Sequence, residues 1–168
     1  MRAIAAEARE PGRVYLTGGA SAVLHGWRDS TIDVDITIVP ENDRILRAIP
    51  EVKERLQVNV ELASPADFVP PLPGWEERSA FISREGSISF HHFDFYTQAL
   101  SKLERAHHKD LLDVDSMVRD GLVDPNRLAR ALRRGVAFAV QVSSHRSAHV
   151  ACRCRAAGLA LAVCAAER

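Results

Sequence analysis

The stretch VYLTGGASAVLHGWRDSTIDVDITIV, residues 14–39, decides the fold. It opens with an apolar run that predicts a short buried strand, and this run leads into the pair Gly18 and Gly19. A short amphipathic segment follows, and residues 26–31 loop back into a second predicted strand over residues 32–39. We therefore expect a strand, a glycine turn, a short helical segment and a returning strand, in that order.

Two carboxylates, Asp33 and Asp35, alternate at the start of the second strand. Side chains two positions apart on a strand point to the same face, with their Cα atoms about 6.6 Å apart. Two negative charges held this close repel each other, so the pair needs a cation or a shared proton. Mg²⁺ prefers carboxylates combined with substrate phosphates. Beside a glycine turn, the pair predicts a metal–nucleotide site, and the alternative is an exposed strand edge with solvated carboxylates.

The glycine turn itself has the character of a phosphate site. Glycine lets backbone N–H groups approach an anion closely, and the start of a helix favours negative charge. A dinucleotide-binding fold is not indicated, because the Gly-x-Gly-x-x-Gly pattern is absent and the next strand follows too soon. The Walker A lysine is absent as well. The alternative is a tight strand-to-helix turn without a ligand.

A third acid is expected from the next strand. Residues 58–62 alternate between apolar and polar side chains, and Glu61 lies within them. A neighbouring strand places such a residue on the same face as Asp33 and Asp35. A third carboxylate would help to deprotonate an attacking hydroxyl and to hold a second ion. The alternative is a solvated glutamate at the end of a strand.

Composition excludes several protein classes. A length of 168 residues indicates one domain with at most a small appendage. The formal net charge is zero, so no global basic field indicates nucleic acid. Residues 126–166 nevertheless contain Arg and no Asp or Glu, which is typical of a solvated helix and tail or of a basic face for a polynucleotide. The three cysteines do not form a disulfide framework, and we expect no membrane segment and a cytoplasmic location.

Helices and a hairpin are predicted around this region. One helix is expected over residues 1–10, and a second follows Pro40 and ends at Pro50. A hairpin is expected around Gly86. Further helices are predicted over residues 94–105, over residues 107–121 and from Asp124 onward.

Two motifs resemble a known family. The pattern GGx(6)GxRxSTxDxD, residues 18–35, resembles the nucleotidyltransferase superfamily shared with DNA polymerase beta. Within that superfamily the chain resembles the AbiEii-type group, which includes toxin components of bacterial toxin–antitoxin systems. The segment LSKLERAHHKDLLDV, residues 100–114, resembles that group's downstream Lys-x(6)-Lys/Arg-Asp-x-x-Asp pattern. The resemblance covers roughly residues 13–120.

The resemblance implies a fold and a reaction. The fold is α+β, a small mixed β-sheet with flanking helices and a helical C-terminal part. The expected division is a core over residues 1–97, a helical C-terminal part over 98–140 and a tail over 141–168 to which the sequence assigns no structure. The implied reaction transfers a nucleoside monophosphate from a nucleoside triphosphate (NTP) to an acceptor hydroxyl, and pyrophosphate leaves.

The resemblance also assigns roles to residues. Asp33 and Asp35 would bind Mg²⁺, and Glu61 stays the third acid expected from the alternation of residues 58–62. Lys102 would meet phosphate charge, and Asp110 would lie near the site or orient Lys102. The residues expected to hold the nucleotide are Gly18, Gly19, Ser21, Arg28 and Ser30, although Arg28 has packing against Asp29 as its alternative.

The chain departs from the group in two respects. Ser101 stands before Lys102, where toxin relatives often carry Glu, and a large acceptor-binding domain is missing. The acceptor therefore stays open between RNA, protein and a small molecule, and an antitoxin partner is an implied expectation. The alternative function is a catalytically inactive nucleotidyltransferase fold that acts as a binding or regulatory module. A third hypothesis is polynucleotide binding through the Arg-rich C-terminal segment.

Overall fold

The computed structural model of the chain describes residues 1–105 and 107–140. Two compact units are present. The first comprises Met1–Asp67 and Gly74–Asp94 and contains the whole sheet, whereas the second comprises Phe68–Pro73 and the chain from Phe95 onward. The tail predicted over residues 141–168 lies outside the described residues.

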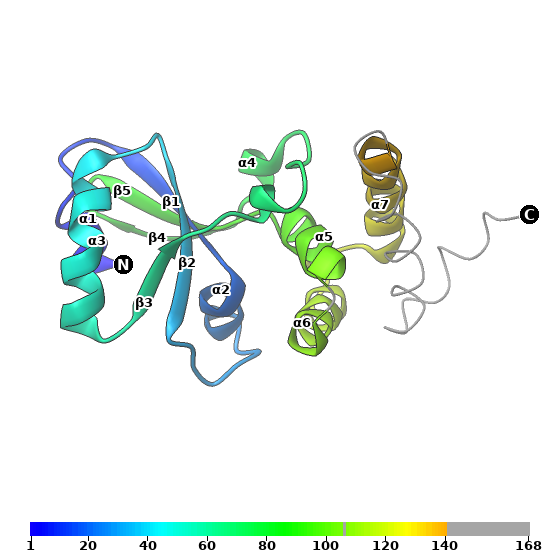
Figure 1. Cartoon of the computed structure of the whole chain (residues 1–168), viewed down its shortest axis with the longest axis horizontal. Helices are drawn as coiled ribbons and strands as arrows, with labels where there is room; N and C mark the ends of the chain where they lie inside the picture. The colour runs from blue at the N-terminus through cyan, green and yellow to red at the C-terminus, as the bar shows by residue number, and fades with distance from the viewer. Residues whose placement is uncertain (106, 141–168) are drawn as a thin grey trace, which may run out of the picture. The chain divides into compact units, whose positions relative to one another are not determined.

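The first unit is built on a five-stranded sheet with the order β3-β2-β1-β5-β4 (Figure 1). The central strand β1 pairs antiparallel with β2 and parallel with β5. β3 runs parallel to β2, and β4 runs antiparallel to β5. The strand bounds are Gly12–Thr17, Asp33–Val39, Asn59–Leu62, Phe81–Glu85 and Ile88–His92 for β1 to β5. The predicted α+β class with a small mixed sheet is confirmed, and so is the hairpin around Gly86.

One face of the sheet is covered by two helices, α1 (Arg2–Ala5) and α3 (Asp43–Leu56), which contact each other; α3 is the long helix at the left of Figure 1. Each large apolar side chain that is buried between these helices and the sheet stabilises the unit by about 1.5–3 kcal/mol. Residues from both helices and from four strands form this core: Ile4, Ala5, Val14, Leu16, Ile36, Ile45, Val52, Val60, Ile88 and Phe90. The helix α1 is shorter than the one predicted over residues 1–10.

The helix α3 shows why one predicted boundary is wrong. It is capped by Asn42, whose side-chain Oδ1 accepts hydrogen bonds from the backbone N–H groups of Arg44 and Ile45, each at 3.1 Å. Pro50 was predicted to end this helix but lies inside it. A proline within a helix removes one hydrogen bond, but burial of Ile45 and Val52 on either side of it keeps the segment helical.

The opposite face of the sheet is polar. Side chains alternate along a strand, and Val14 and Leu16 belong to the core. Tyr15 and Thr17 therefore point to the other face. On β2 the core residue Ile36 has Asp35 as its neighbour, so the aspartates of this strand share the face of Tyr15 and Thr17.

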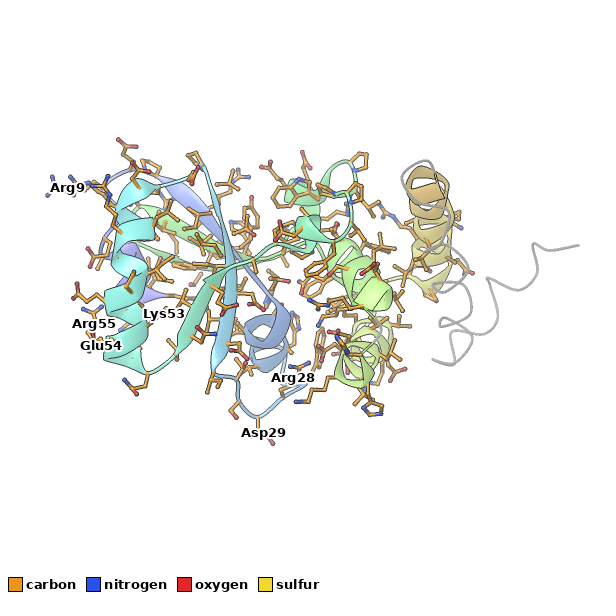
Figure 2. All side chains as sticks on the ribbon, in the orientation of Figure 1. Arg9, Arg28, Asp29, Lys53, Glu54 and Arg55 are labelled. Carbon is orange, nitrogen blue, oxygen red and sulfur yellow. The ribbon has the colours of Figure 1, made fainter. Side chains whose placement is uncertain are left out.

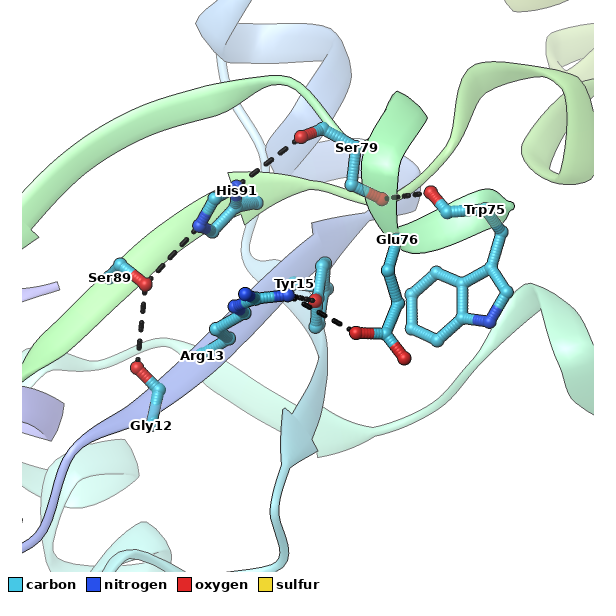
Figure 3. A network of polar contacts seen from close by, with 8 residues as sticks. All are labelled: Gly12, Arg13, Tyr15, Trp75, Glu76, Ser79, Ser89 and His91. Carbon is cyan, nitrogen blue, oxygen red and sulfur yellow. Dashed lines mark hydrogen bonds and ion pairs between the residues drawn. The ribbon is translucent and has the colours of Figure 1, made fainter.

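An aromatic group covers part of this polar face. α4 (Trp75–Arg78) brings Trp75 against Phe93, with ring centroids 4.5 Å apart and planes 8° from parallel, and against Tyr15 at 4.9 Å. The Arg13 guanidinium donates to the Tyr15 hydroxyl at 3.4 Å and pairs with Glu76 at 3.1 Å (Figure 3). Trp75 is thus a packing residue of this unit.

The second unit contains three helices, α5 (Phe95–Arg105), α6 (His108–Arg119) and α7 (Pro125–Val140). The side chain of Asp124 caps α7 and accepts a hydrogen bond from the Arg127 N–H at 2.6 Å. All three helices are predicted from the sequence, so the helical C-terminal part is confirmed. In the described ranges no helix combines the length and apolar character needed to cross a bilayer.

Candidate active site

The strand register brings three acids onto neighbouring positions of the polar face. Asp35 on β2 pairs with Glu61 on β3, and Asp33 pairs with Asn59. Across the other edge of β2, Asp35 pairs with Thr17, the last residue of β1. Paired positions on neighbouring strands share a face. The acids therefore lie at the end of β1 from which the glycine turn emerges.

An amide links two of the acids. The side-chain Nδ2 of Asn59 donates to Asp33 Oδ1 at 3.1 Å and to Glu61 Oε1 at 2.8 Å. Asp33 and Glu61 are both exposed, and Asn59 is half-buried. Two carboxylates from different strands thus come within reach of one nitrogen atom on a surface open to a ligand.

The third acid lies against the glycine turn. Gly18 begins α2 (Gly18–Leu24) with a φ of +58°, and a Cβ built on it would collide with Asp35 Oδ2. A Cβ on Gly19 would lie 2.5 Å from Thr31 Oγ1. Gly18 thus combines a positive φ with a close contact to a β2 side chain, and Gly19 lies against Thr31 on the loop that leads into β2. The backbone of the turn and the carboxylate of Asp35 are in direct contact.

The chemistry of these side chains suits a hard divalent cation. Carboxylate oxygens are the ligands that Mg²⁺ prefers, and the missing Cβ of Gly18 leaves the room that the Asp35 carboxylate occupies. Among the residues that the structure describes, no three His, Cys, Asp or Glu side chains are grouped so as to hold a metal ion as they stand. Gathering the acids around one ion requires the exposed side chains of Asp33 and Glu61 to rotate.

Ser21 is directed away from solvent. Its side chain is 1% exposed, and its Oγ lies 2.7 Å from His92 Nδ1. The His92 ring lies 4.4 Å from the ring of His25, which stacks on Trp27 at 4.8 Å. A phosphate contact by the Ser21 hydroxyl would require it to leave His92, so this predicted role stays a prediction.

Arg28 and Ser30 lie on the loop between α2 and β2. Figure 2 shows Arg28 beside Asp29, which lies at the tip of this loop. Arg28 is half-buried, whereas Asp29 and Ser30 are exposed. The loop belongs to the same unit as the three acids, and the phosphate contacts expected of Arg28 and Ser30 stay predictions.

Lys102 and Asp110 belong to the second unit and are bonded to each other. Lys102 is 3% exposed, and its Nζ lies 3.1 Å from Asp110 Oδ1 and 2.7 Å from Asp113 Oδ2. Arg105 Nη2 also donates to Asp110 Oδ1, at 3.1 Å. The pairing holds the Lys102 ammonium between the two aspartates, and the orienting role expected of Asp110 stays a prediction. The ammonium group joins α5 to α6, and its predicted phosphate contact stays a prediction.

Comparison with known proteins decides the family. The family model described as "Nucleotidyltransferase of unknown function (DUF6036)" matches residues 2–153. The chain belongs to this nucleotidyltransferase family. The match includes the glycine turn, the three acids and the segment with Lys102. Comparison with curated proteins and with solved structures gives no match.

Three residues that contact the predicted site residues have no role assigned from the sequence, although Thr31 and Asp113 lie within the quoted motifs. Asn59 precedes Glu61 by two positions, so strand alternation places the two on one face. Asp113 follows Asp110 by one helical turn, so both face the same neighbour. Thr31, whose Oγ1 accepts from the Asp33 N–H at 3.2 Å, carries a weaker signal, because its contact with Gly19 depends on the path of the loop.

The buried His92 predicts a pH dependence of stability. Burial and, to a smaller extent, the neighbouring His25 lower the pKa of His92 to about 4. Between pH 6.5 and about 4 the unfolded chain binds a proton at His92 that the folded chain does not, so stability falls as the pH falls through this window. The melting temperature of His92→Gln is expected to fall less steeply there than that of the wild type. Parallel curves for the two proteins would contradict the assignment.

Proposed function

We propose that the protein is a Mg²⁺-dependent nucleotidyltransferase, which transfers a nucleoside monophosphate from an NTP to an acceptor hydroxyl. One observation carries the proposal: the register pairs Asp35 with Glu61 beside Asp33 and packs the Asp35 carboxylate against Gly18. A phosphate-sized turn and three acids are thereby joined in one unit. Membership of a nucleotidyltransferase family supports the same reaction.

The residues of this site would act mainly by positioning and by charge. The acceptor oxygen attacks the α-phosphorus, the bond from that phosphorus to the bridging oxygen breaks, and pyrophosphate leaves with the bond's electron pair. Backbone N–H groups at Gly18 and Gly19 would hold the triphosphate, and an exposed carboxylate such as Glu61 would accept the proton of the hydroxyl. Asp33 and Asp35 would be the principal ligands of Mg²⁺, which would neutralise part of the triphosphate charge.

The finer assignments rest on the resemblance to the AbiEii-type group. They are a role in a toxin–antitoxin pair, a cytoplasmic location, and RNA or a protein as acceptor. Arg28 and Ser30 would add contacts to the nucleotide, and Lys102 would add positive charge. These assignments are part of the proposal, and acceptor screening addresses them directly.

One observation favours a second candidate function, a binding module that has lost transfer. Among the described residues the acids are not grouped as metal ligands as they stand: Asn59 lies between Asp33 and Glu61, and Asp35 contacts the glycine turn. A protein that binds a nucleotide or a partner without transferring a nucleoside monophosphate would not need the three acids to lie closer together. Tight nucleotide binding without transfer to any acceptor would support this alternative.

The test uses each of the four NTPs, radiolabelled at the α-phosphate, with Mg²⁺ and total cellular RNA, and measures transfer of the label. We expect label on RNA or protein with the wild type, and none after chelation with EDTA. Asp33→Asn and Asp35→Asn should each lower the rate by at least about a hundredfold. The matched control is Asp29→Asn, an exposed aspartate on the adjacent loop, which should keep the wild-type rate. Wild-type rates in both Asp33→Asn and Asp35→Asn would overturn the proposal.

A further inference from the structure

The amide of Asn59 occupies the position at which two acids of neighbouring strands approach each other. Its nitrogen lies 3.1 Å from Asp33 Oδ1 and 2.8 Å from Glu61 Oε1. Carboxylates accept hydrogen bonds and donate none when ionised, so the NH₂ side of the amide faces both of them. One neutral group with two N–H bonds thus satisfies one oxygen of each acid.

The backbone fixes this arrangement. Asn59 is the register partner of Asp33 across the β2–β3 pair, and Glu61 is two positions along the same strand. The Asn59 N–H also bonds to the Ile32 carbonyl at 2.6 Å, at the entry to β2. The backbone of Asn59 is therefore fixed next to the start of β2, and this fixes the point from which its side chain extends. The two carboxylates, in contrast, are exposed and carry like charges that repel.

We propose that Asn59 is a positioning residue of the acid site, which holds the carboxylates of Asp33 and Glu61 at the spacing from which they close on a divalent cation. The inference rests on the proposed function, and it assigns to a neutral residue the control of cation affinity. Without the amide, repulsion and side-chain rotation separate the two carboxylates. Part of the free energy of cation binding must then offset the cost of bringing them together, which weakens the observed affinity. Residues that orient metal ligands change affinity or activity by about 10–100-fold when replaced.

The probe is Mn²⁺ alone, titrated into the full-length chain by calorimetry. We expect Asn59→Ala to bind Mn²⁺ about tenfold or more weakly than the wild type, with little change in melting temperature because the side chain is only half-buried. In the transfer assay the same variant should need more Mg²⁺ for half-maximal rate and approach the wild-type rate at saturation. A residue that only stabilises the fold would not produce this split.

The control separates stability from cation affinity. Asn42→Ala removes an asparagine of the same unit whose side chain caps α3. It should lower the melting temperature and leave Mn²⁺ affinity unchanged. Asn59→Asp supplies a second test: with a charge added between Asp33 and Glu61, it should melt at a lower temperature in EDTA and recover when Mn²⁺ is added.

The outcomes distinguish this inference from the proposed function. If Mn²⁺ binds the wild type, fails to bind Asp35→Asn and binds Asn59→Ala unchanged or more tightly, the role of Asn59 is rejected and the acid site stands. If Mn²⁺ binds Asp35→Asn as well as the wild type, or neither of them, the metal site of the proposed function fails. Weaker binding by Asn59→Ala together with unchanged binding by Asn42→Ala supports the inference.

Discussion

Replacing Gly18 with alanine is expected to lower nucleotide transfer by at least about a hundredfold, because small displacements of a catalytic group are this costly. The new Cβ would occupy the space of Asp35 Oδ2, so the carboxylate would have to move away from the turn. The residue also has a φ of +58°, where alanine costs roughly 1–2 kcal/mol. Initial transfer rates and thermal melting, measured on the same preparation, separate the two effects.

The matched control for this variant is Gly26→Ala. Gly26 has a φ of +74°, so alanine suffers the same backbone strain, but nothing lies within 4 Å of a Cβ built there. Gly26→Ala should lose only the stability that backbone strain costs, Gly18→Ala should lose at least as much, and only Gly18→Ala should lose transfer. Equal transfer rates in the two variants would show that the contact between Gly18 and Asp35 has no part in the reaction.

Replacing Lys102 with methionine is expected to destabilise the second unit by about 3–5 kcal/mol. The ammonium group is buried between Asp110 and Asp113, at 3.1 and 2.7 Å. Methionine keeps the length of the side chain and removes its charge, which takes from Asp113 its 2.7 Å ion pair while leaving Arg105 on Asp110. The change is measured as the shift in the urea midpoint, followed by circular dichroism at a wavelength dominated by the helices.

The control for the lysine variant lies on the next helix. Lys109 is exposed on α6, so Lys109→Met should change stability by no more than about 0.5 kcal/mol. A similarly small effect of Lys102→Met would mean that its two ion pairs contribute nothing net to the fold. In that case loss of transfer by a stable Lys102→Met protein would favour the phosphate contact expected from the family resemblance.

The order of strands and helices was largely predictable from the sequence, because apolar periodicity reports burial directly. The predicted return strand over residues 32–39 and the hairpin around Gly86 follow from alternation and turn chemistry. Pro50 shows the limit of local rules, since its missing hydrogen bond is outweighed by burial of Ile45 and Val52 elsewhere in the helix. Tertiary packing is invisible to a rule that considers one residue and its neighbours.

The site was predictable in part, for a different reason. Spacing alone places Asp33 and Asp35 on one face, but the pairing of Asp35 with Glu61 is set by the register between two strands. The partner of a polar group is harder still to predict: the Ser21 hydroxyl bonds to His92, a residue of the last strand. A sequence motif identifies which groups are available, and long-range folding decides which of them face the ligand.

The position of β1 in the sheet has a consequence for synthesis of the chain. Its parallel partner β5 ends at His92, so until the ribosome has passed that point β1 has a neighbour on one side only. On that side the backbone N–H and C=O groups of β1 are unpaired, and the strand carries the apolar side chains of Val14 and Leu16. Unpaired edges of apolar strands can pair with strands of other molecules. The β4–β5 hairpin covers that edge once it has been synthesised. Chains truncated before residue 88 are therefore expected to aggregate rather than form a smaller soluble sheet.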